Sequence, residues 1–184
     1  MNNSVIDVTI EIPKNSNIKY EYDRANGNIK VDRILYGANI YPENYGFIPN
    51  ALDWDGDELD ILVISDHSFL PGTIVPTRIL GAMTMVDDGE TDTKLIGVID
   101  CDPRFKQINS INDIPEHKLS VIRNFFETYK ILQKKQVKIG SFKDATWAQK
   151  ELNECISLMK KYGKMPKEKF ISLMMKKYPG KYSK

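Results

Sequence analysis

An acidic segment, Asp53 to Asp60, carries the most chemical information in this chain. It places five carboxylates within eight residues and leads directly into the apolar run Ile61 to Ile64, which is typical of a buried strand. Crowded carboxylates repel one another unless solvent or a cation compensates, and oxygen ligands favour hard cations such as magnesium, manganese or calcium. A carboxylate cluster on a buried strand therefore predicts a site for several metal ions, suited to hydrolysis of a phosphoryl compound.

A second acidic turn, Asp87 to Lys94, lies between two expected strands. Two such turns in one chain favour a shared cation site, although the sequence does not itself bring them together. A calcium loop of the EF-hand type is excluded by spacing. A loop starting at Asp53 would need glycine at its sixth position and glutamate at its twelfth, which here are Glu58 and Ile64.

Several cationic and phenolic residues stand near the ends of expected strands and helices. Each alone is usually a surface residue or a core tyrosine, but together they provide the bidentate, point-charge and hydroxyl contacts that a polyphosphate needs. The group comprises Lys19, Arg33, Tyr45, Lys94, Tyr129 and Lys130. No GxxxxGK phosphate loop is present, so nucleotide binding of that kind is not supported.

The hydrophobic pattern predicts short strands followed by helices. Alternating or apolar runs indicate strands at residues 8–12, 19–22, 29–35, 61–64, 74–80, 82–86 and 95–99, with a turn at 26–27 and a loop at 41–47. A helix capped by Asp113 is expected over 115–129, a second over 145–162 and a short third around 170–174. The second should bury Ala148, Leu152, Ile156 and Met159. This order indicates a small barrel with helices packed outside it.

Length and composition indicate a globular cytoplasmic protein. A chain of 184 residues with 41% apolar residues fits one domain, and it has neither an apolar run suited to a membrane helix nor a signal-peptide pattern at its start. Nine lysines and one acid lie between Lys160 and Lys184, whereas the whole chain has a net charge of +1. The main body is therefore acidic, which argues against nucleic acid as a partner.

In sequence order, these residues resemble the family I soluble inorganic pyrophosphatases of bacterial type. The match runs from about Ile10 to Leu152. It is carried by Ile10-Glu11-Ile12-Pro13, Lys19-Tyr20-Glu21, Val31-Asp32-Arg33, Tyr41-Pro42-Glu43-Asn44-Tyr45-Gly46, Asp55-Gly56-Asp57-Glu58-Leu59-Asp60, Asp87 to Lys94, and Phe125-Phe126-Glu127-Thr128-Tyr129-Lys130. The Asp-Gly-Asp-Glu-Leu-Asp signature is specific by itself, and the ordered set makes coincidence very improbable.

The resemblance implies a mainly β fold, an OB-like five-stranded β-barrel with flanking C-terminal α-helices. It also implies magnesium-dependent hydrolysis of inorganic pyrophosphate to two orthophosphates, with manganese or zinc as possible substitutes. By position, Asp57 would be the general base. Asp55, Asp60 and Asp92 would bind a metal pair, Asp87 with Asp92 a further ion, and Glu11 and Glu21 would act through waters of the ions. The phosphates would be held by Lys19, Arg33, Tyr45, Lys94, Tyr129 and Lys130.

The resemblance also implies a homo-oligomer, in bacterial relatives commonly a hexamer. It divides the chain into a catalytic domain over 1–160 and a basic, helical extension over 161–184, which is interpreted as a surface helix or as a subunit contact or anionic-surface anchor. Two alternatives stay open for the activity. One is another metal-dependent phosphohydrolase acting on a nucleotide or on polyphosphate. The other is an OB-type module that binds single-stranded nucleic acid, which the carboxylates around the tyrosines disfavour.

Overall fold

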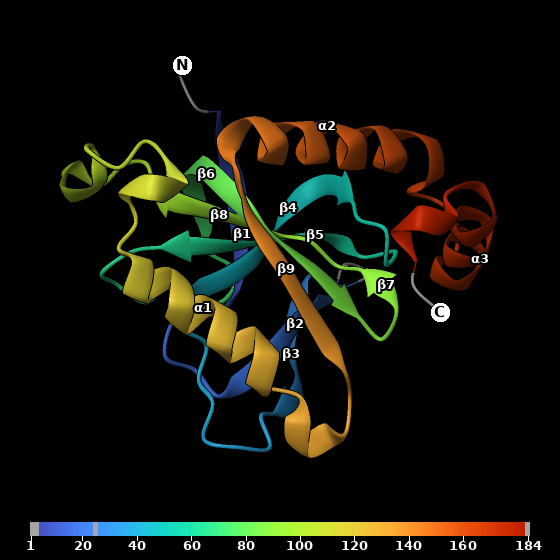
Figure 1. The fold of residues 1–184 in the computed structure, drawn as a ribbon, viewed down its shortest axis with the longest axis horizontal. Helices are drawn as coiled ribbons and strands as arrows, with labels where there is room; N and C mark the ends of the chain where they lie inside the picture. Colours follow the sequence, from blue (N-terminus) through green and yellow to red (C-terminus); the bar gives the residue numbers. More distant parts are fainter. Residues whose placement is uncertain (1–3, 24–25, 183–184) are drawn as a thin grey trace.

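Five strands close into a barrel in the computed structural model, which describes residues 4–23 and 26–182 (Figure 1). Around the barrel they follow the order β1 (Val5–Ile12), β4 (Asn44–Leu52), β5 (Glu58–Ile64), β8 (Lys94–Ile99) and β6 (Ile74–Asp87). Pairing of β6 with β1 closes the ring, and only the β5–β8 pair within it is parallel. The predicted five-stranded barrel is confirmed.

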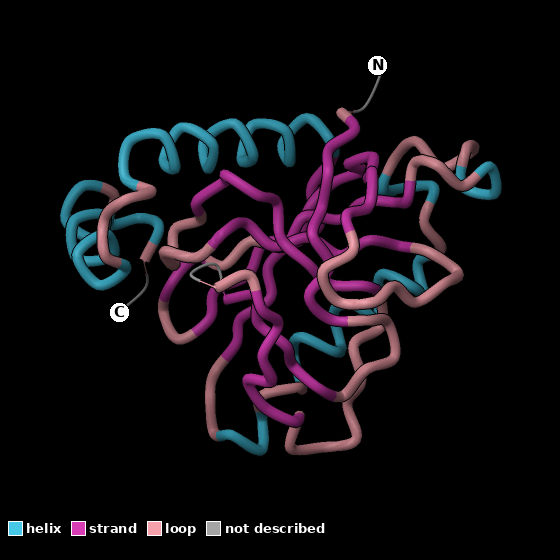
Figure 2. Tube along the Cα trace, turned by 180° about the vertical axis from the view of Figure 1, so that it is seen from behind, coloured by secondary structure: helices cyan, strands magenta, loops and turns pink. Residues whose placement is uncertain are grey.

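Two further groups of strands and the helices surround this barrel. Strands β2 (Ile18–Asp23) and β3 (Asn28–Ile34) form a separate hairpin, while β7 (Glu90–Thr91) and β9 (Val137–Asp144) pair with β6. The helices are α1 (Glu116–Thr128), α2 (Ala145–Tyr162) and α3 (Lys167–Lys177). Helix α2 packs across β4 and β6, α1 lies against β9, and α3 sits beside β7 at the end of α2 (Figures 1 and 2). No helix within residues 4–23 and 26–182 is long and apolar enough to span a membrane.

The barrel core follows from the alternation of apolar residues along the strands. Val8, Ile10 and Ile12 of β1 are completely buried, because successive side chains of a strand point to opposite faces. Strand β5, covered on both faces, contributes an almost unbroken buried run from Leu59 to Ile64. Burial at roughly 25 cal/mol per Å² makes these side chains the main source of stability.

The loop predicted over residues 41–47 is partly wrong, because the residues from Asn44 onward belong to strand β4 (Asn44–Leu52). Its turn-rich composition indicates a loop, but Asn44 is completely buried and its amide bridges two distant backbone groups. It donates to the carbonyl of His67 at 2.8 Å and accepts from the N–H of Phe69 at 2.9 Å. A polar residue satisfied inside the fold by distant partners leaves no local pattern in the sequence.

The structure differs from the strand predictions at two further places. Residues 74–87 form one strand with a register shift between Ile79 and Gly81, whereas the sequence predicted a break at Gly81. A side chain at Gly81 would collide with the carbonyl oxygen of Lys143 in β9. The glycine therefore allows the backbones of β6 and β9 to approach closely. Strand β9 itself was not predicted, because its mixed and half-exposed residues show no clear period of two.

The helices form where they are predicted, but the capping of α1 and the buried face of α2 differ from the prediction. Helix α1 begins at Glu116 after Pro115 with no side-chain cap, while Asp113 belongs to a capping box with Ser110 on the short 3-10 helix Ile111–Asp113. Helix α2 spans the predicted residues and buries Ala148 and Leu152 as expected. Its remaining buried face is formed by Glu151, Cys155 and Leu158, with Ile156 and Met159 only partly buried.

Gly46 allows strands β1 and β4 to approach closely. A Cβ atom at this position would collide with the carbonyl oxygen of Thr9 and lie 2.9 Å from the Cα of Ile10. We therefore expect Gly46→Ala to lower the free energy of unfolding by about 1–3 kcal/mol, measured by denaturant titration. Gly180→Ala is the matched control, because nothing lies within 4 Å of its added Cβ. Equal stability of the two variants would contradict the close-approach explanation.

Candidate active site

One cavity of about 490 Å³ is lined by every residue that the sequence predicts for the site. The set comprises Glu11, Lys19, Glu21, Arg33, Tyr45, Asp55, Asp57, Asp60, Asp87, Asp92, Lys94, Tyr129 and Lys130. These residues come from β1, the β2–β3 hairpin, β4, β5, β6, β8, the connecting turns and the end of α1. The fold therefore brings the two acidic turns into one site, as predicted, although the individual roles stay predictions.

The parallel pairing of β5 with β8 positions the centre of the site. Its register sets Asp60 opposite Lys94, and the ammonium of Lys94 lies 2.5 Å from Oδ2 of Asp60. The same ammonium also pairs with Asp92, and the hydroxyl of Tyr45 donates to Oδ2 of Asp60 at 2.5 Å. Only 3% of the Lys94 side chain is exposed. The buried ammonium of Lys94 thus joins the two acidic turns by pairing with one carboxylate of each.

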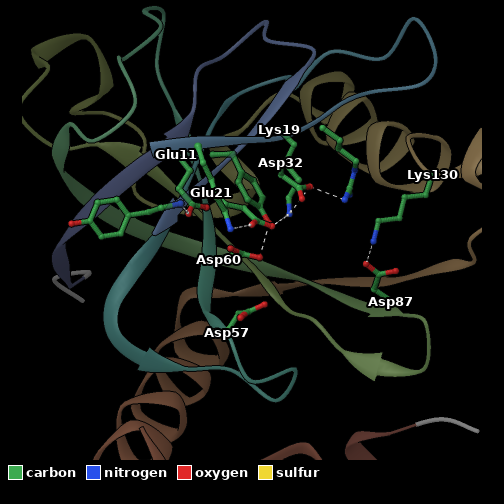
Figure 3. Close-up of polar contacts among 12 residues, drawn as sticks. Glu11, Lys19, Glu21, Asp32, Asp57, Asp60, Asp87 and Lys130 are labelled. Atoms are coloured by element: carbon green, nitrogen blue, oxygen red, sulfur yellow. Dashed lines mark hydrogen bonds and ion pairs between the residues drawn. The ribbon is translucent and has the colours of Figure 1, made fainter. Parts of the chain in front are cut away.

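Further ion pairs border the cavity around this centre. Lys130 pairs with Asp87, while the ammonium of Lys19 lies 2.9 Å from Glu21 and 3.6 Å from Asp32 (Figure 3). Arg33 binds the same Asp32 carboxylate at 2.9 Å. Each of these lysine and arginine side chains is therefore already paired with a carboxylate.

Asp57 occupies a different environment from the other carboxylates. Its side chain is 60% exposed, and Oδ2 lies 2.5 Å from the ammonium of Lys167 on α3. Lys167 also lines the cavity, together with Glu90 and Lys135, and the sequence assigned no individual role to any of these three. The only available signal for Lys167 was the lysine-rich composition of the extension, which cannot indicate which lysine reaches the site.

Burial and repulsion between neighbouring carboxylates shift the pKa values of acids in the site. Desolvation, followed by the charges of Asp92 and Asp57, raises the pKa of Asp55 to about 8. Desolvation also raises the pKa of Asp92, although Lys94 opposes the shift. Burial acts to lower the pKa of Lys94, but Asp60 and Asp92 outweigh it and the pKa stands well above its ordinary value. The cluster is therefore short of positive charge.

The donor atoms of the site fit a divalent cation. The side chains that converge from the two acidic turns are carboxylates, which suit magnesium or manganese rather than soft metals. Oδ1 of Asp87 is buried and finds no hydrogen-bond partner among the residues that the structure describes. An unsatisfied buried carboxylate oxygen is a free ligand position, and a cation there would offset the repulsion that raises the pKa of Asp55.

We expect cation binding to release a proton from Asp55. With a pKa of about 8, its carboxyl is mostly protonated at pH 7, and a cation binds only the ionised form. Magnesium affinity should therefore rise as pH increases through 8. Isothermal titration calorimetry at pH 7, in buffers of different ionisation heat, should show release of about one proton, and Asp55→Asn should lose it. A binding heat that is independent of the buffer would contradict this assignment.

Comparison with known proteins agrees with this geometry. The family model described as inorganic pyrophosphatase matches residues 8–160. An inorganic pyrophosphatase of Malacoplasma penetrans is 67% identical over 96% of this chain and 98% of its own length, and that of Mycoplasma pneumoniae is 60% identical over the whole of both chains. The crystal structure of the inorganic pyrophosphatase from Thermus thermophilus superimposes with a TM-score of 0.82 at 45% identity, covering 85% of this chain and 91% of that one.

The fold of this chain, a barrel with a carboxylate-lined cavity, is thus similar to that of a solved inorganic pyrophosphatase. The chain belongs to the inorganic pyrophosphatase family.

Proposed function

We propose that this protein is an enzyme that hydrolyses inorganic pyrophosphate to two orthophosphates with magnesium as cofactor. One observation carries the proposal: two acidic turns meet the lysine and arginine side chains predicted to bind phosphate in a single cavity, in a chain of the inorganic pyrophosphatase family. Pyrophosphate is strongly anionic, so an acidic cavity can receive it only together with cations. The lysines supply part of that charge and divalent ions supply the remainder.

The carboxylates divide into metal ligands and one base. Asp55, Asp60 and Asp92 would hold a pair of ions, and Asp87 with Asp92 a further one. Glu11 and Glu21, on the neighbouring strands β1 and β2, would bind more indirectly, through water. When bound, the ions would neutralise the charge of pyrophosphate and make a water molecule more acidic. Manganese or zinc are possible substitutes for magnesium.

The remaining residues act on the substrate and on the proton. Lys94 and Lys130 would exchange their carboxylate partners for phosphate oxygens, and Lys19 and Arg33 would do so from the hairpin. The hydroxyls of Tyr45 and Tyr129 would donate to phosphate oxygens. Pre-placed cations stabilise the charge that develops on the departing phosphate. Asp57, the most exposed of the acids in these ion pairs, would accept the proton of the attacking water.

The other predictions about the whole protein belong to the same proposal. Residues 1–160 would form the catalytic domain and 161–184 a basic extension, of which 183–184 lie outside the described residues. A cytoplasmic homohexamer remains the predicted assembly, with no membrane or nucleic acid as partner. Size-exclusion chromatography with light scattering tests the assembly directly, since a monomer would contradict it.

The activity is tested by measuring phosphate release from pyrophosphate at neutral pH. We expect rapid release with magnesium and its loss when a chelator is added, because both the substrate and the acidic cavity need the cation. Adenosine triphosphate and tripolyphosphate serve as competing substrates and should react much more slowly. No release from folded, magnesium-loaded protein would contradict the function, and faster release from a nucleotide would reassign the substrate.

A further inference from the structure

The segment beyond residue 160, where the family match ends, is tied to both acidic turns of the site. The hydroxyl of Tyr182 donates to the backbone carbonyl of Trp54 at 2.6 Å, within the first turn. The hydroxyl of Thr91, in the second turn, donates to the carbonyl of Lys181 at 2.6 Å. The C-terminal segment therefore connects two loops that converge on the cavity.

Helix α3 is fixed to the body by an apolar cluster of its own. Phe170 and Met174 are essentially completely buried against Leu52, Trp54 and Leu158. A helix anchored by two fully buried side chains has a defined position relative to the first acidic turn. The residues on its first turn are therefore held near the cavity rather than ranging freely over the surface.

Gly56 provides the space into which α3 fits. Its φ is +84°, and a Cβ atom there would lie 2.9 Å from Cγ of Lys167 and 3.5 Å from Phe170. The stem of Lys167 thus packs directly over the glycine that separates Asp55 from Asp57. This contact aims the ammonium at Asp57 and places it 2.5 Å from Oδ2.

Lys167 repeats an arrangement, a lysine paired with an aspartate, that recurs elsewhere in the cavity. Lys94 pairs with Asp60 and Asp92, and Lys130 pairs with Asp87. Those two lysines belong to the catalytic region, whereas Lys167 comes from the extension yet lines the same cavity. An ordinary exposed ion pair contributes little to stability, so the significance of this pair lies in which carboxylate it orients.

We propose that Lys167 is a positioning residue for pyrophosphate hydrolysis, holding one oxygen of the Asp57 carboxylate so that the other can accept the proton of the attacking water. The proposal rests on the function proposed above and on the role of Asp57 in it. Lys167 makes no bond to the reacting atoms. It acts by restricting the rotation of an exposed side chain whose orientation determines how well the proton is accepted.

The test compares steady-state kinetics of Lys167→Met, Lys167→Arg and wild type at saturating magnesium. We expect Lys167→Met to lower kcat by about tenfold with little change in KM, and Lys167→Arg to recover most of the loss. The matched control is Lys169→Met, an exposed lysine on the same helix that does not line the cavity, and its kinetics should equal those of the wild type. Circular dichroism confirms that each variant is folded.

A double-mutant cycle with Asp57→Asn separates positioning from a general structural effect. If Lys167 acts through the Asp57 carboxylate, Lys167→Met should cause no further loss once that carboxylate is absent. An equal fold-loss in both backgrounds, an unchanged kcat, or a rise in KM alone would each overturn the proposal. Inactivity of the wild type on pyrophosphate would instead refute the function itself, so the two failures are distinguishable.

Discussion

Replacing Asp57 with asparagine is expected to lower kcat for pyrophosphate hydrolysis by about 100- to 10,000-fold, the usual range for loss of a positioned general base. An amide of the same shape keeps the packing of the first acidic turn but cannot accept the proton of the attacking water. The side chain is 60% exposed, so the substitution should leave the fold intact. Phosphate release under single-turnover and steady-state conditions measures the effect.

Asp66→Asn is the matched control for this variant. Asp66 is an aspartate of similar exposure, 62%, whose only ion pair within residues 4–23 and 26–182 is a 3.7 Å contact with Arg104, and it does not line the cavity. Its activity should stay within twofold of wild type. If Asp57→Asn also retained wild-type kcat, the function would stand and another group would have to be the base.

Replacing Lys94 with methionine should strongly destabilise the metal-free protein, by about 3–5 kcal/mol. The lysine side chain is 3% exposed and neutralises Asp60 and Asp92, so its loss leaves two carboxylates close together with no counter-charge. Magnesium should restore part of the stability, because cations at the same carboxylates replace the missing charge. Denaturant unfolding with chelator and with magnesium provides the measurement.

Lys135→Met removes a second lysine from the rim of the same cavity and serves as the comparison. Its pair with Asp88 is about half exposed on both sides, so the loss should be at most about 1 kcal/mol. A Lys94→Met variant as stable as Lys135→Met would show that the buried pairs do not hold the two turns together. Absence of any magnesium effect on Lys94→Met would argue against a cation at these carboxylates.

The nature of the chemistry was determined largely by the sequence. Carboxylates separated by at most two residues before an apolar strand indicate a hard-cation site whatever the fold, because crowded charge must be compensated. The strand periodicity and the boundaries of α2 were likewise readable from local patterns. These are short-range properties, and a linear sequence records them.

The relative placement of the turns was decided by the tertiary structure. Parallel pairing of β5 with β8 sets Asp60 beside Lys94, although the two residues lie 34 apart in the sequence. The burial that raises the pKa of Asp55 also exists only once the cavity is formed. The sequence predicted a shared site from the presence of two acidic turns, but only the barrel gives the reason for it.

Lys167 is the clearest example of a residue whose place in the site is decided by the tertiary structure alone. From the sequence it is one of nine lysines between Lys160 and Lys184, with nothing local to distinguish it. The structure selects it because α3 is anchored by Phe170 and Met174, and because Gly56 leaves space for its stem. Residue types and local spacing thus determined which chemistry is possible, while long-range packing decided which side chains meet, since contacts between distant residues depend on the closed fold.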